Sequence, residues 1–314
     1  MPEYTLRKRL VKLGTFAARL FARAVGRYAR RMRIESGRIT VVCADAWRER
    51  LETDGFLDFA AVMARQDGEA AKTRLSERQV HRFALADGSV VYLKRYFEIG
   101  VLDALKHRFE PTGCGSPAAR EWTALMRLKQ IGVPSIEPLA YAEERRGGLV
   151  RRCYVVTLAL PEGITLEETA DPVFEPPFDA EVDSLKRYLI VQAGRLVAAM
   201  HRGGVNHRDL YLGHLWLTFK LGGAFELRLL DLNRADVRPE VSDRWVVKDL
   251  AALSFSAAPR LFSFRDRVRF LRAYGWSKQE IRARLGAIRT RAEKMRAHVR
   301  RRIAEGRANY HINE

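Results

Sequence analysis

The sequence is poor in cysteine and contains no long apolar run. Its three cysteines, Cys43, Cys114 and Cys153, lie far apart and form no C-x-x-C pair. This usage argues against a zinc site or a disulfide framework, and a reducing cytoplasm is the simplest setting for it. No apolar run approaches the roughly 20 residues that a membrane-spanning helix requires. The composition, 47% hydrophobic and 30% charged over 314 residues, is typical of a soluble globular chain with a large core.

Two glycine motifs of common enzyme classes are also missing. No G-x-S-x-G turn occurs, so a Ser/His/Asp hydrolase is not supported. No G-x-G-x-x-G loop occurs, and residues 67–76, where such a loop would precede a later lysine strand, contain only Gly68. Either another backbone shape covers nucleotide phosphates in this chain, or a nucleotide is held less tightly than such a loop would hold it.

Positive charge, in contrast, is abundant. The chain has 56 Lys and Arg against 38 Asp and Glu, a formal net charge of +18 and a pI near 10.2. A charge of this size indicates an anionic partner, which is nucleic acid, anionic lipid or a phosphorylated glycan. Charge alone does not choose among the three.

The first 38 residues predict a basic amphipathic helix. Apolar residues recur at three-to-four spacing from Leu6 to Tyr28, with arginines and lysines between them. The segment lacks the continuous apolar centre of a secretory signal. One interpretation places this helix in an anionic membrane interface, and the other is a solvated helix that packs on its own domain.

A predicted hairpin carries the first candidate site residue. Strand-like runs at Gln79–Leu85 and Ser89–Tyr96 flank a turn, and the second run contains Lys94. A helix is expected over Ala118–Gln130, with Glu121 near its start. In kinases a strand lysine holds nucleotide phosphates and pairs with a glutamate on the following helix. The alternative is that both are ordinary surface residues.

The most informative stretch runs from residue 205 to 236. It contains His207-Arg208-Asp209-Leu210, which fits the start of the kinase motif H-R-D-L-x-x-x-N, although His214 stands at the Asn position. A later apolar run ends in Asp231, as expected of a buried strand that presents a carboxylate. In kinases the first Asp accepts the proton of the substrate hydroxyl and the second holds Mg²⁺.

Three segments together resemble the bacterial lipopolysaccharide kinases of the Kdo/WaaP family. They are HRDLYLGHLWL, LLDLNRADVR and RWVVKDLAAL, in this order, and the resemblance extends from about Gly68 to about Tyr274. It implies an α+β fold of the two-lobed protein-kinase-like type. The expected lobes are a small sheet-rich N-lobe at 39–160 and a larger helical C-lobe at 161–314 that ends in basic helices.

The resemblance also implies a role for each candidate residue, with ATP and Mg²⁺ as cofactors. Asp209 would orient and deprotonate the acceptor hydroxyl, Asp231 would bind Mg²⁺, and Lys94, paired with Glu121, would hold the phosphates. His214 has three possible roles: a weak ligand of a second metal, a hydrogen-bond partner of Asp209 or of a nucleotide phosphate, or only a support of the loop. The family does not rely on the glycine loop, which favours another backbone shape over the phosphates.

One further carboxylate, Asp249, lies in the Lys-Asp-Leu sequence of the third segment. Kinase-like folds use an Asp in the corresponding helix to accept hydrogen bonds from the backbone of the catalytic loop. The alternative is an ordinary exposed carboxylate.

The implied activity is ATP-dependent phosphorylation of a sugar hydroxyl, of heptose or of Kdo, in the lipopolysaccharide inner core. The expected partners are this glycolipid and, peripherally, the anionic cytoplasmic face of the inner membrane, and no nucleic acid is expected. The sequence leaves two alternatives open. One is a protein or small-molecule kinase of the same fold, and the other is a catalytically weak basic scaffold that binds nucleic acid or membrane.

Overall fold

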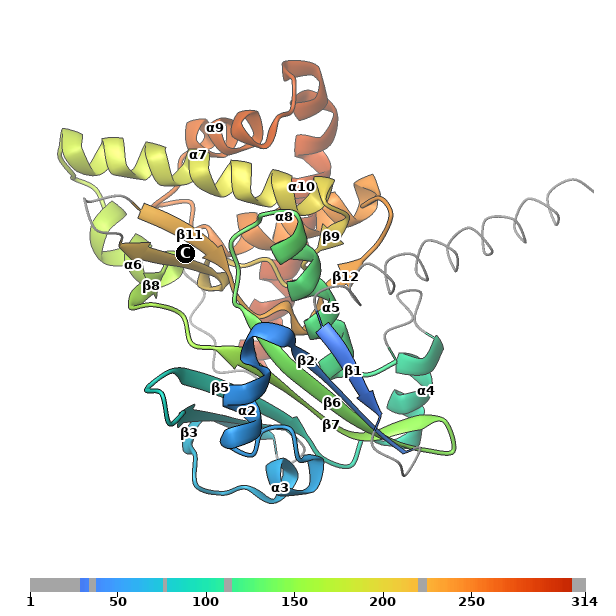
Figure 1. Ribbon diagram of the computed structural model, residues 1–314. Helices are drawn as coiled ribbons and strands as arrows, with labels where there is room; N and C mark the ends of the chain where they lie inside the picture. The colour runs from blue at the N-terminus through green and yellow to red at the C-terminus, as the bar shows by residue number, and fades with distance from the viewer. Residues whose placement is uncertain (1–28, 34–37, 76–77, 110–114, 220–224, 307–314) are drawn as a thin grey trace, which may run out of the picture. The chain divides into compact units, whose positions relative to one another are not determined.

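The computed structural model describes residues 29–33, 38–75, 78–109, 115–219 and 225–306. The chain forms two compact units (Figure 1). The first comprises Met1–Lys129, Ile136–Leu160 and Asp236–Pro239, and the second comprises Gln130–Ser135, Pro161–Ala235 and Glu240–Glu314. The first is rich in strands and the second in helices, so the mixed α+β architecture expected from the sequence is confirmed.

The first unit is built on a seven-stranded antiparallel sheet. Its spatial order is β1-β2-β6-β7-β5-β4-β3. The strands are β1 (Ala29–Arg33), β2 (Ile39–Ala44), β3 (Glu69–Leu75), β4 (Arg78–Ala84), β5 (Val90–Tyr96), β6 (Pro138–Arg146) and β7 (Leu149–Leu158). The predicted hairpin is confirmed as β4 and β5, closed at Gly88 with φ 82°, a value that suits glycine.

Helices and buried apolar side chains complete this unit. The helices are η1 (Asp45–Trp47), α2 (Arg48–Thr53), α3 (Phe59–Ala64), α4 (Val101–Phe109) and α5 (Pro117–Gln130), and a short strand, β12 (Asp236–Val237), also belongs to it. The two described cysteines, Cys43 and Cys153, are free and buried in the core. Burial raises the pKa of the Cys43 thiol to about 11 and that of Cys153 to about 12, so both stay uncharged.

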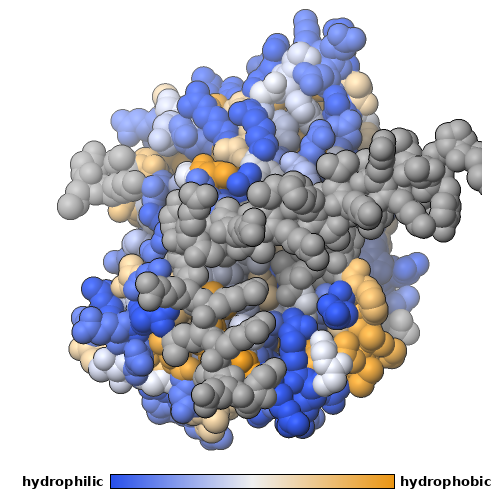
Figure 2. All heavy atoms as spheres, turned by 45° about the vertical axis from the view of Figure 1, so that its right-hand side comes forward, coloured by the Kyte–Doolittle hydropathy of each residue, from blue (hydrophilic) through white to orange (hydrophobic). Residues whose placement is uncertain are grey.

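Two segments of this unit differ from the sequence-based expectations. The helix predicted over Leu6–Tyr28 lies outside the described residues. Ala29–Arg33, which the prediction assigned to the same N-terminal helical segment, forms strand β1 instead. The reason is that β2 offers these residues a complete antiparallel ladder of hydrogen bonds. Helix α4 was not expected. Figure 2 shows hydrophobic side chains gathered at the lower right of the view, on the side where Figure 1 places α4.

The second unit contains most of the helices. Its elements are β8 (Gly163–Thr165), α6 (Leu166–Phe174), α7 (Ala180–Arg202), β9 (Val205–Asn206), η2 (Leu212–His214), β10 (Leu215–Phe219), β11 (Phe225–Leu229), η3 (Leu232–Arg234), α8 (Asp243–Ser256), α9 (Phe264–Tyr274) and α10 (Lys278–Ala304). Strands β11, β10 and β8 form a small sheet in that order. The helix expected over Ser184–Arg202 is confirmed as α7 and begins earlier, because Asp179 caps it by accepting the N–H of Val182.

Close helix packing fixes the core of the second unit. Helix α7 runs along α9, and α8 packs against α10 (Figure 1). A Cβ atom at Gly194 of α7 would lie 2.7 Å from the carbonyl oxygen of Phe270, so only glycine allows this approach of α7 to α9. Among the described residues, no helix combines the length and the apolar character needed to cross a membrane.

Candidate active site

The first unit brings Lys94 and Glu121 together. Lys94 lies on β5 and Glu121 on α5, and the Lys94 Nζ atom donates to Oε1 of Glu121 at 2.6 Å. The carboxylate side chain is completely buried and the lysine side chain is 12% exposed. The alternative of two unrelated surface residues is therefore wrong. A buried ion pair of this kind holds an ammonium group in a fixed position, because loss of either partner would leave an uncompensated charge.

In the second unit, Asp249 anchors the loop that carries Asp209. Its buried carboxylate accepts the backbone N–H of His207 at 2.7 Å and that of Arg208 at 2.8 Å. Arg208 has φ 71°, a left-handed conformation that is unfavourable for arginine and that these bonds help to hold. The expectation that Asp249 supports the backbone of this loop is confirmed, and the alternative of an exposed carboxylate is wrong.

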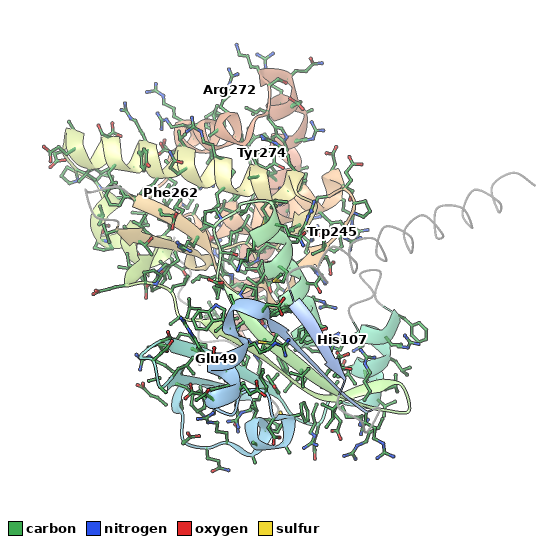
Figure 3. All side chains as sticks on the ribbon, viewed as in Figure 1. Glu49, His107, Trp245, Phe262, Arg272 and Tyr274 are labelled. Atoms are coloured by element: carbon green, nitrogen blue, oxygen red, sulfur yellow. The ribbon has the colours of Figure 1, made fainter. Side chains whose placement is uncertain are left out.

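A buried hydrogen-bond chain continues behind Asp249. His201 of α7 donates from Nε2 to Oδ2 of Asp249 at 3.2 Å, and its Nδ1 lies 2.9 Å from the hydroxyl of Tyr274 on α9 (Figure 3). Because a carboxylate only accepts, the proton sits on Nε2 and the tyrosine hydroxyl donates to Nδ1. Burial raises the pKa of Tyr274, so the hydroxyl keeps its proton. Three helices thus fix the loop through polar contacts.

His207 links this loop to the end of β11. Its ring is buried, and Nε2–H donates to the carbonyl oxygen of Leu230 at 2.8 Å, one residue before Asp231. Burial is the main cause that lowers the pKa of His207, so the ring is neutral at physiological pH. A buried neutral ring with this bond serves as a link between the two segments that carry Asp209 and Asp231.

The structure shows a hydrogen bond from His214 to Asp209, one of the contacts that the sequence suggested. In η2 its Nδ1–H donates to the backbone carbonyl oxygen of Asp209 at 2.6 Å, and its ring stacks on His207 with centroids 5.6 Å apart. The other ring nitrogen, Nε2, is on the side of the second carboxylate. This Nε2 lies 3.8 Å from Oδ2 of Asp231. His214 therefore ties the backbone at Asp209 and faces the second carboxylate.

The structure adds Arg234, which sequence reasoning missed. Its NH1 group donates to both carboxylate oxygens of Asp209, at 2.9 and 3.1 Å. The arginine side chain is 53% exposed, so the guanidinium is only partly held by the fold. The one sequence signal was its place in the DLNRA segment, three residues after Asp231.

Asp231 meets the requirements for a magnesium ligand. It follows β11 in a left-handed conformation, φ 52°, and starts η3 with its side chain 39% exposed. The described residues contain no group of three or more histidines, cysteines and carboxylates that would hold a metal by themselves. Mg²⁺ usually binds through one or two carboxylates and completes its shell with nucleotide phosphates and water. The carboxylate of Asp231 fits such an ion, whereas the imidazole of His214 is a softer donor.

Three cationic side chains surround Trp245 of α8, a residue labelled in Figure 3. The Nζ atom of Lys248 lies 4.7 Å from the indole centroid, and the guanidinium carbons of Arg208 and Arg244 lie 5.4 and 5.9 Å from it. Burial first, and then Arg208 and Arg234, lower the pKa of Lys248. The surroundings of Asp209 in the second unit therefore favour an anionic ligand.

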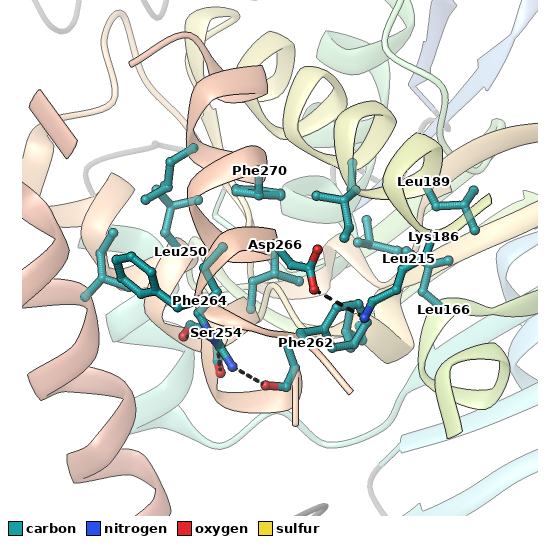
Figure 4. Close-up of a pocket in the computed structure, with 18 of the residues that line it drawn as sticks. Leu166, Lys186, Leu189, Leu215, Leu250, Ser254, Phe262, Phe264, Asp266 and Phe270 are labelled. Carbon is teal, nitrogen blue, oxygen red and sulfur yellow. Dashed lines mark hydrogen bonds and ion pairs between the residues drawn. The ribbon is translucent and has the colours of Figure 1, made fainter. Parts of the chain in front are cut away.

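The second unit also contains an apolar cavity of about 110 Å³, which the sequence did not predict (Figure 4). Helices α6 to α10 contribute to its wall, together with Leu212 and Leu215 on either side of His214. The ammonium group of Lys186 enters this apolar space, lies 3.2 Å from Asp266 and contacts three phenylalanine rings. None of the predicted catalytic side chains lines the cavity, so it is separate from the polar site.

Comparison with known proteins gives concordant results. The model of the lipopolysaccharide kinase (Kdo/WaaP) family matches residues 60–274, which include all the candidate site residues. The lipopolysaccharide core heptose(I) kinase WaaP of Pseudomonas aeruginosa is 40% identical over 160 residues, which are 50% of this chain and 59% of that protein. The protein of the same name from Escherichia coli K12 is 32% identical over 221 residues, 69% of this chain and 81% of that protein.

A solved structure of WaaP in complex with acyl carrier protein is similar in fold. The two chains are 31% identical in sequence and superpose with a TM-score of 0.63. The match covers 81% of this chain and 98% of the solved WaaP chain. With the sheet-rich first unit and the helical second unit, this likeness confirms the expected protein-kinase-like α+β fold.

Proposed function

Because the chain belongs to the lipopolysaccharide kinase (Kdo/WaaP) family, we propose that it transfers the γ-phosphoryl group of ATP to a sugar hydroxyl of the lipopolysaccharide inner core. The names of its relatives favour a heptose, the first of the core, over Kdo as the acceptor. The observation that carries the proposal is the loop of Asp209. Asp249 and His214 form hydrogen bonds with its backbone, and His207 links it to the segment that carries Asp231.

In the proposed reaction Asp209 acts as the base. Its carboxylate accepts the proton of the sugar hydroxyl while the hydroxyl oxygen forms a bond to the γ-phosphorus, and the bond from that phosphorus to the bridging oxygen of ADP breaks. Lys94, fixed by Glu121, binds phosphate oxygens. Mg²⁺, when bound, would neutralise phosphate charge, and Asp231 would hold it.

Arg234 holds the carboxylate of Asp209 in place before the reaction. One NH1 group bonds both oxygens of Asp209, so a small shift onto one oxygen frees the other for the hydroxyl. The half-exposed side chain permits this shift because solvent, and not packing, surrounds much of it. Arg234 is thus proposed as a positioning residue for Asp209.

The proposed acceptor also agrees with the charge around the loop. Lys248, Arg244 and Arg208 surround Trp245 in the same unit as Asp209, and an inner-core glycolipid supplies anionic groups for such cations. Because this acceptor is anchored in lipid, the proposed place of action is the cytoplasmic face of the inner membrane, with the protein attached peripherally.

A second partner is proposed from the structural relative. That protein was solved with an acyl carrier protein, and this chain covers 98% of it. The apolar cavity of the second unit offers room for part of an acyl chain. Size-exclusion chromatography with acylated and unacylated carrier protein tests the idea, and co-elution of neither form would contradict it.

The decisive experiment is phosphate transfer from radiolabelled ATP, with Mg²⁺, to dephosphorylated lipopolysaccharide core. We expect Asp209→Asn to abolish labelling of the glycolipid while ATP binding persists, and Asp231→Ala to impair Mg²⁺-dependent nucleotide binding. Asp243→Asn, which changes an exposed carboxylate of α8, is the matched control and should label normally. A generic protein substrate runs in parallel.

Each other outcome identifies an alternative. Labelling of protein alone would favour a protein kinase. ATP binding without any labelling would favour a weakly catalytic scaffold, and normal turnover of Asp209→Asn would show that the base is another group.

A further inference from the structure

Helix α4 exposes an unusual amount of apolar surface. Four of the eight exposed large hydrophobic side chains among the described residues belong to this nine-residue helix: Val101, Leu102, Leu105 and Phe109. Leu102 is 75% and Phe109 79% exposed. Single exposed apolar residues are normal on a protein surface, but a cluster on one element indicates an interaction site.

The four side chains lie on one face. At about 100° per residue, they span an arc of about 100° around the helix axis. Ala104 and His107 lie on the opposite side, where Ala104 is completely buried and His107 is half-buried, and α4 packs on β7. The apolar arc therefore faces away from the sheet that holds the helix.

Basic residues border this arc on both sides. On the same helical projection, Lys106 follows Leu102 at one edge and Arg108 precedes Val101 at the other, and both side chains are exposed. Asp103, the one acidic residue of α4, forms an ion pair with Lys106 at 2.6 Å. An apolar stripe between two cations is the arrangement in which long basic side chains reach lipid headgroups while apolar ones enter the acyl region.

We propose that α4 is a membrane-docking helix, which inserts Val101, Leu102, Leu105 and Phe109 into the interface of an anionic bilayer. A protein partner suits this surface less well. A stable protein interface buries about 800 Å² on each side, and its centre is usually depleted of lysine. Two and a half helical turns with basic borders offer a small patch whose charge complements anionic lipid headgroups instead.

This site differs from the basic segment predicted at Leu6–Tyr28, since α4 lies between the strand of Lys94 and the helix of Glu121. It also does not depend on the proposed reaction. Vesicles for the test contain phosphatidylglycerol and phosphatidylcholine and no lipopolysaccharide, so their binding reports on α4 whether or not the chain is a core kinase.

The first test compares vesicle co-sedimentation of the full chain with that of the double variant Leu102→Ser/Phe109→Ser. Partitioning should fall by about tenfold or more for each side chain, as expected when a Leu or Phe is no longer transferred out of water. The matched control is Phe219→Ser, which removes a 63% exposed phenylalanine from β10 and should bind as the unchanged chain does. Both variants should keep the far-ultraviolet circular dichroism of the unchanged chain, because the replaced side chains are exposed.

A second measurement locates the contact. Tryptophan placed by Phe109→Trp should shift to the blue and be quenched by brominated lipid, beyond the response of the unchanged chain, whereas Phe219→Trp should not. Replacement of Lys106 and Arg108 by Gln should weaken binding to phosphatidylglycerol vesicles more than to neutral ones. Unchanged partitioning of the double variant with no shift of Phe109→Trp would overturn the proposal. So would a self-association, seen by analytical ultracentrifugation, that the double variant abolishes while vesicle binding stays constant.

Discussion

His214 contacts both halves of the site through different ring atoms. Its Nδ1 donates to the backbone of Asp209, and its Nε2 faces Asp231. The first contact is a short hydrogen bond at 2.6 Å, whereas the second, at 3.8 Å, is beyond hydrogen-bond range. At the scale of the single residue, the Nδ1 bond is therefore the stronger reason for a histidine at this position.

Two substitutions of His214 separate these contacts. His214→Asn keeps an N–H group near the position of Nδ1 and should retain kcat to within about fivefold. His214→Ala removes the bond and should lose about tenfold to a hundredfold, the cost of a partly buried acceptor left without its donor. The measurement is kcat together with the Mg²⁺ concentration for half-maximal rate. A large rise in that concentration for both variants would instead indicate that Nε2 binds the metal.

The sequence anticipated some of these residues for identifiable physical reasons. Lys94 and Glu121 were found because a hairpin and a helix place them, and periodicity predicts both elements. The contact of Arg234 with Asp209 joins residues 25 positions apart and depends on the left-handed turn at Asp231. No local pattern predicts such a turn at an aspartate, so the sequence could not predict this ion pair.

At the scale of the element, α8 is the part that holds the Asp209 loop. The buried carboxylate of Asp249 accepts hydrogen bonds from two backbone N–H groups and from His201. The same helix carries Asp243 at its first turn, where an exposed carboxylate pairs with Arg284 at 3.0 Å. One helix therefore offers a buried and an exposed aspartate for comparison.

We expect Asp249→Ala to destabilise the fold by about 2 to 5 kcal/mol, because two buried N–H groups and a histidine would lose their acceptor. Asp243→Ala should change stability by less than about 1 kcal/mol, as is usual for an exposed ion pair. Urea unfolding followed by tryptophan fluorescence measures both. Equal midpoints for the two variants would contradict the anchoring role of α8.

Elements with strong periodicity were predictable and short ones were not. The β4–β5 hairpin and α7 follow from alternation, from helical spacing and from the glycines that end them. Helix α4 was not predicted because its apolar residues face outward. Apolar spacing is usually taken to mark the side of a helix that faces the core, and that assumption fails here. Strand β1 forms only because β2 is beside it, a tertiary cause that local sequence does not contain.

At the scale of the whole molecule, several groups make stability depend on pH in the same direction. Burial is the main cause that lowers the pKa of His81, His107 and His207. The Arg152 side chain lowers the pKa of Glu144, and hydrogen bonds from Ser263 help to lower that of Asp266. Each of these groups binds protons more readily when the chain is unfolded, so acidification favours unfolding.

We therefore expect the free energy of unfolding to fall as the pH drops below about 6.5, the value of an unfolded histidine, and to fall again below about pH 4 as carboxylates protonate. His81 provides a specific check, because its Nδ1 accepts from the Arg95 guanidinium at 3.2 Å and protonation would break that bond. In His81→Gln the loss of stability between pH 7.5 and 5.5 should be smaller. Urea midpoints at three pH values measure it, and an unchanged slope would exclude His81 as a contributor.

Strand β1 has a practical and mechanical consequence. Its five residues complete one border of the seven-stranded sheet, so a truncation intended to remove only the basic N-terminal segment must end before Ala29. A cut after Arg33 would bare the hydrogen-bonding groups of β2, and open strand borders promote aggregation. Such a cut would therefore make an effect of the missing basic segment indistinguishable from a loss of solubility. Because β1 is hydrogen-bonded to β2, a pulling force on the residues before Ala29 would be transmitted through these backbone hydrogen bonds to the sheet that carries Lys94.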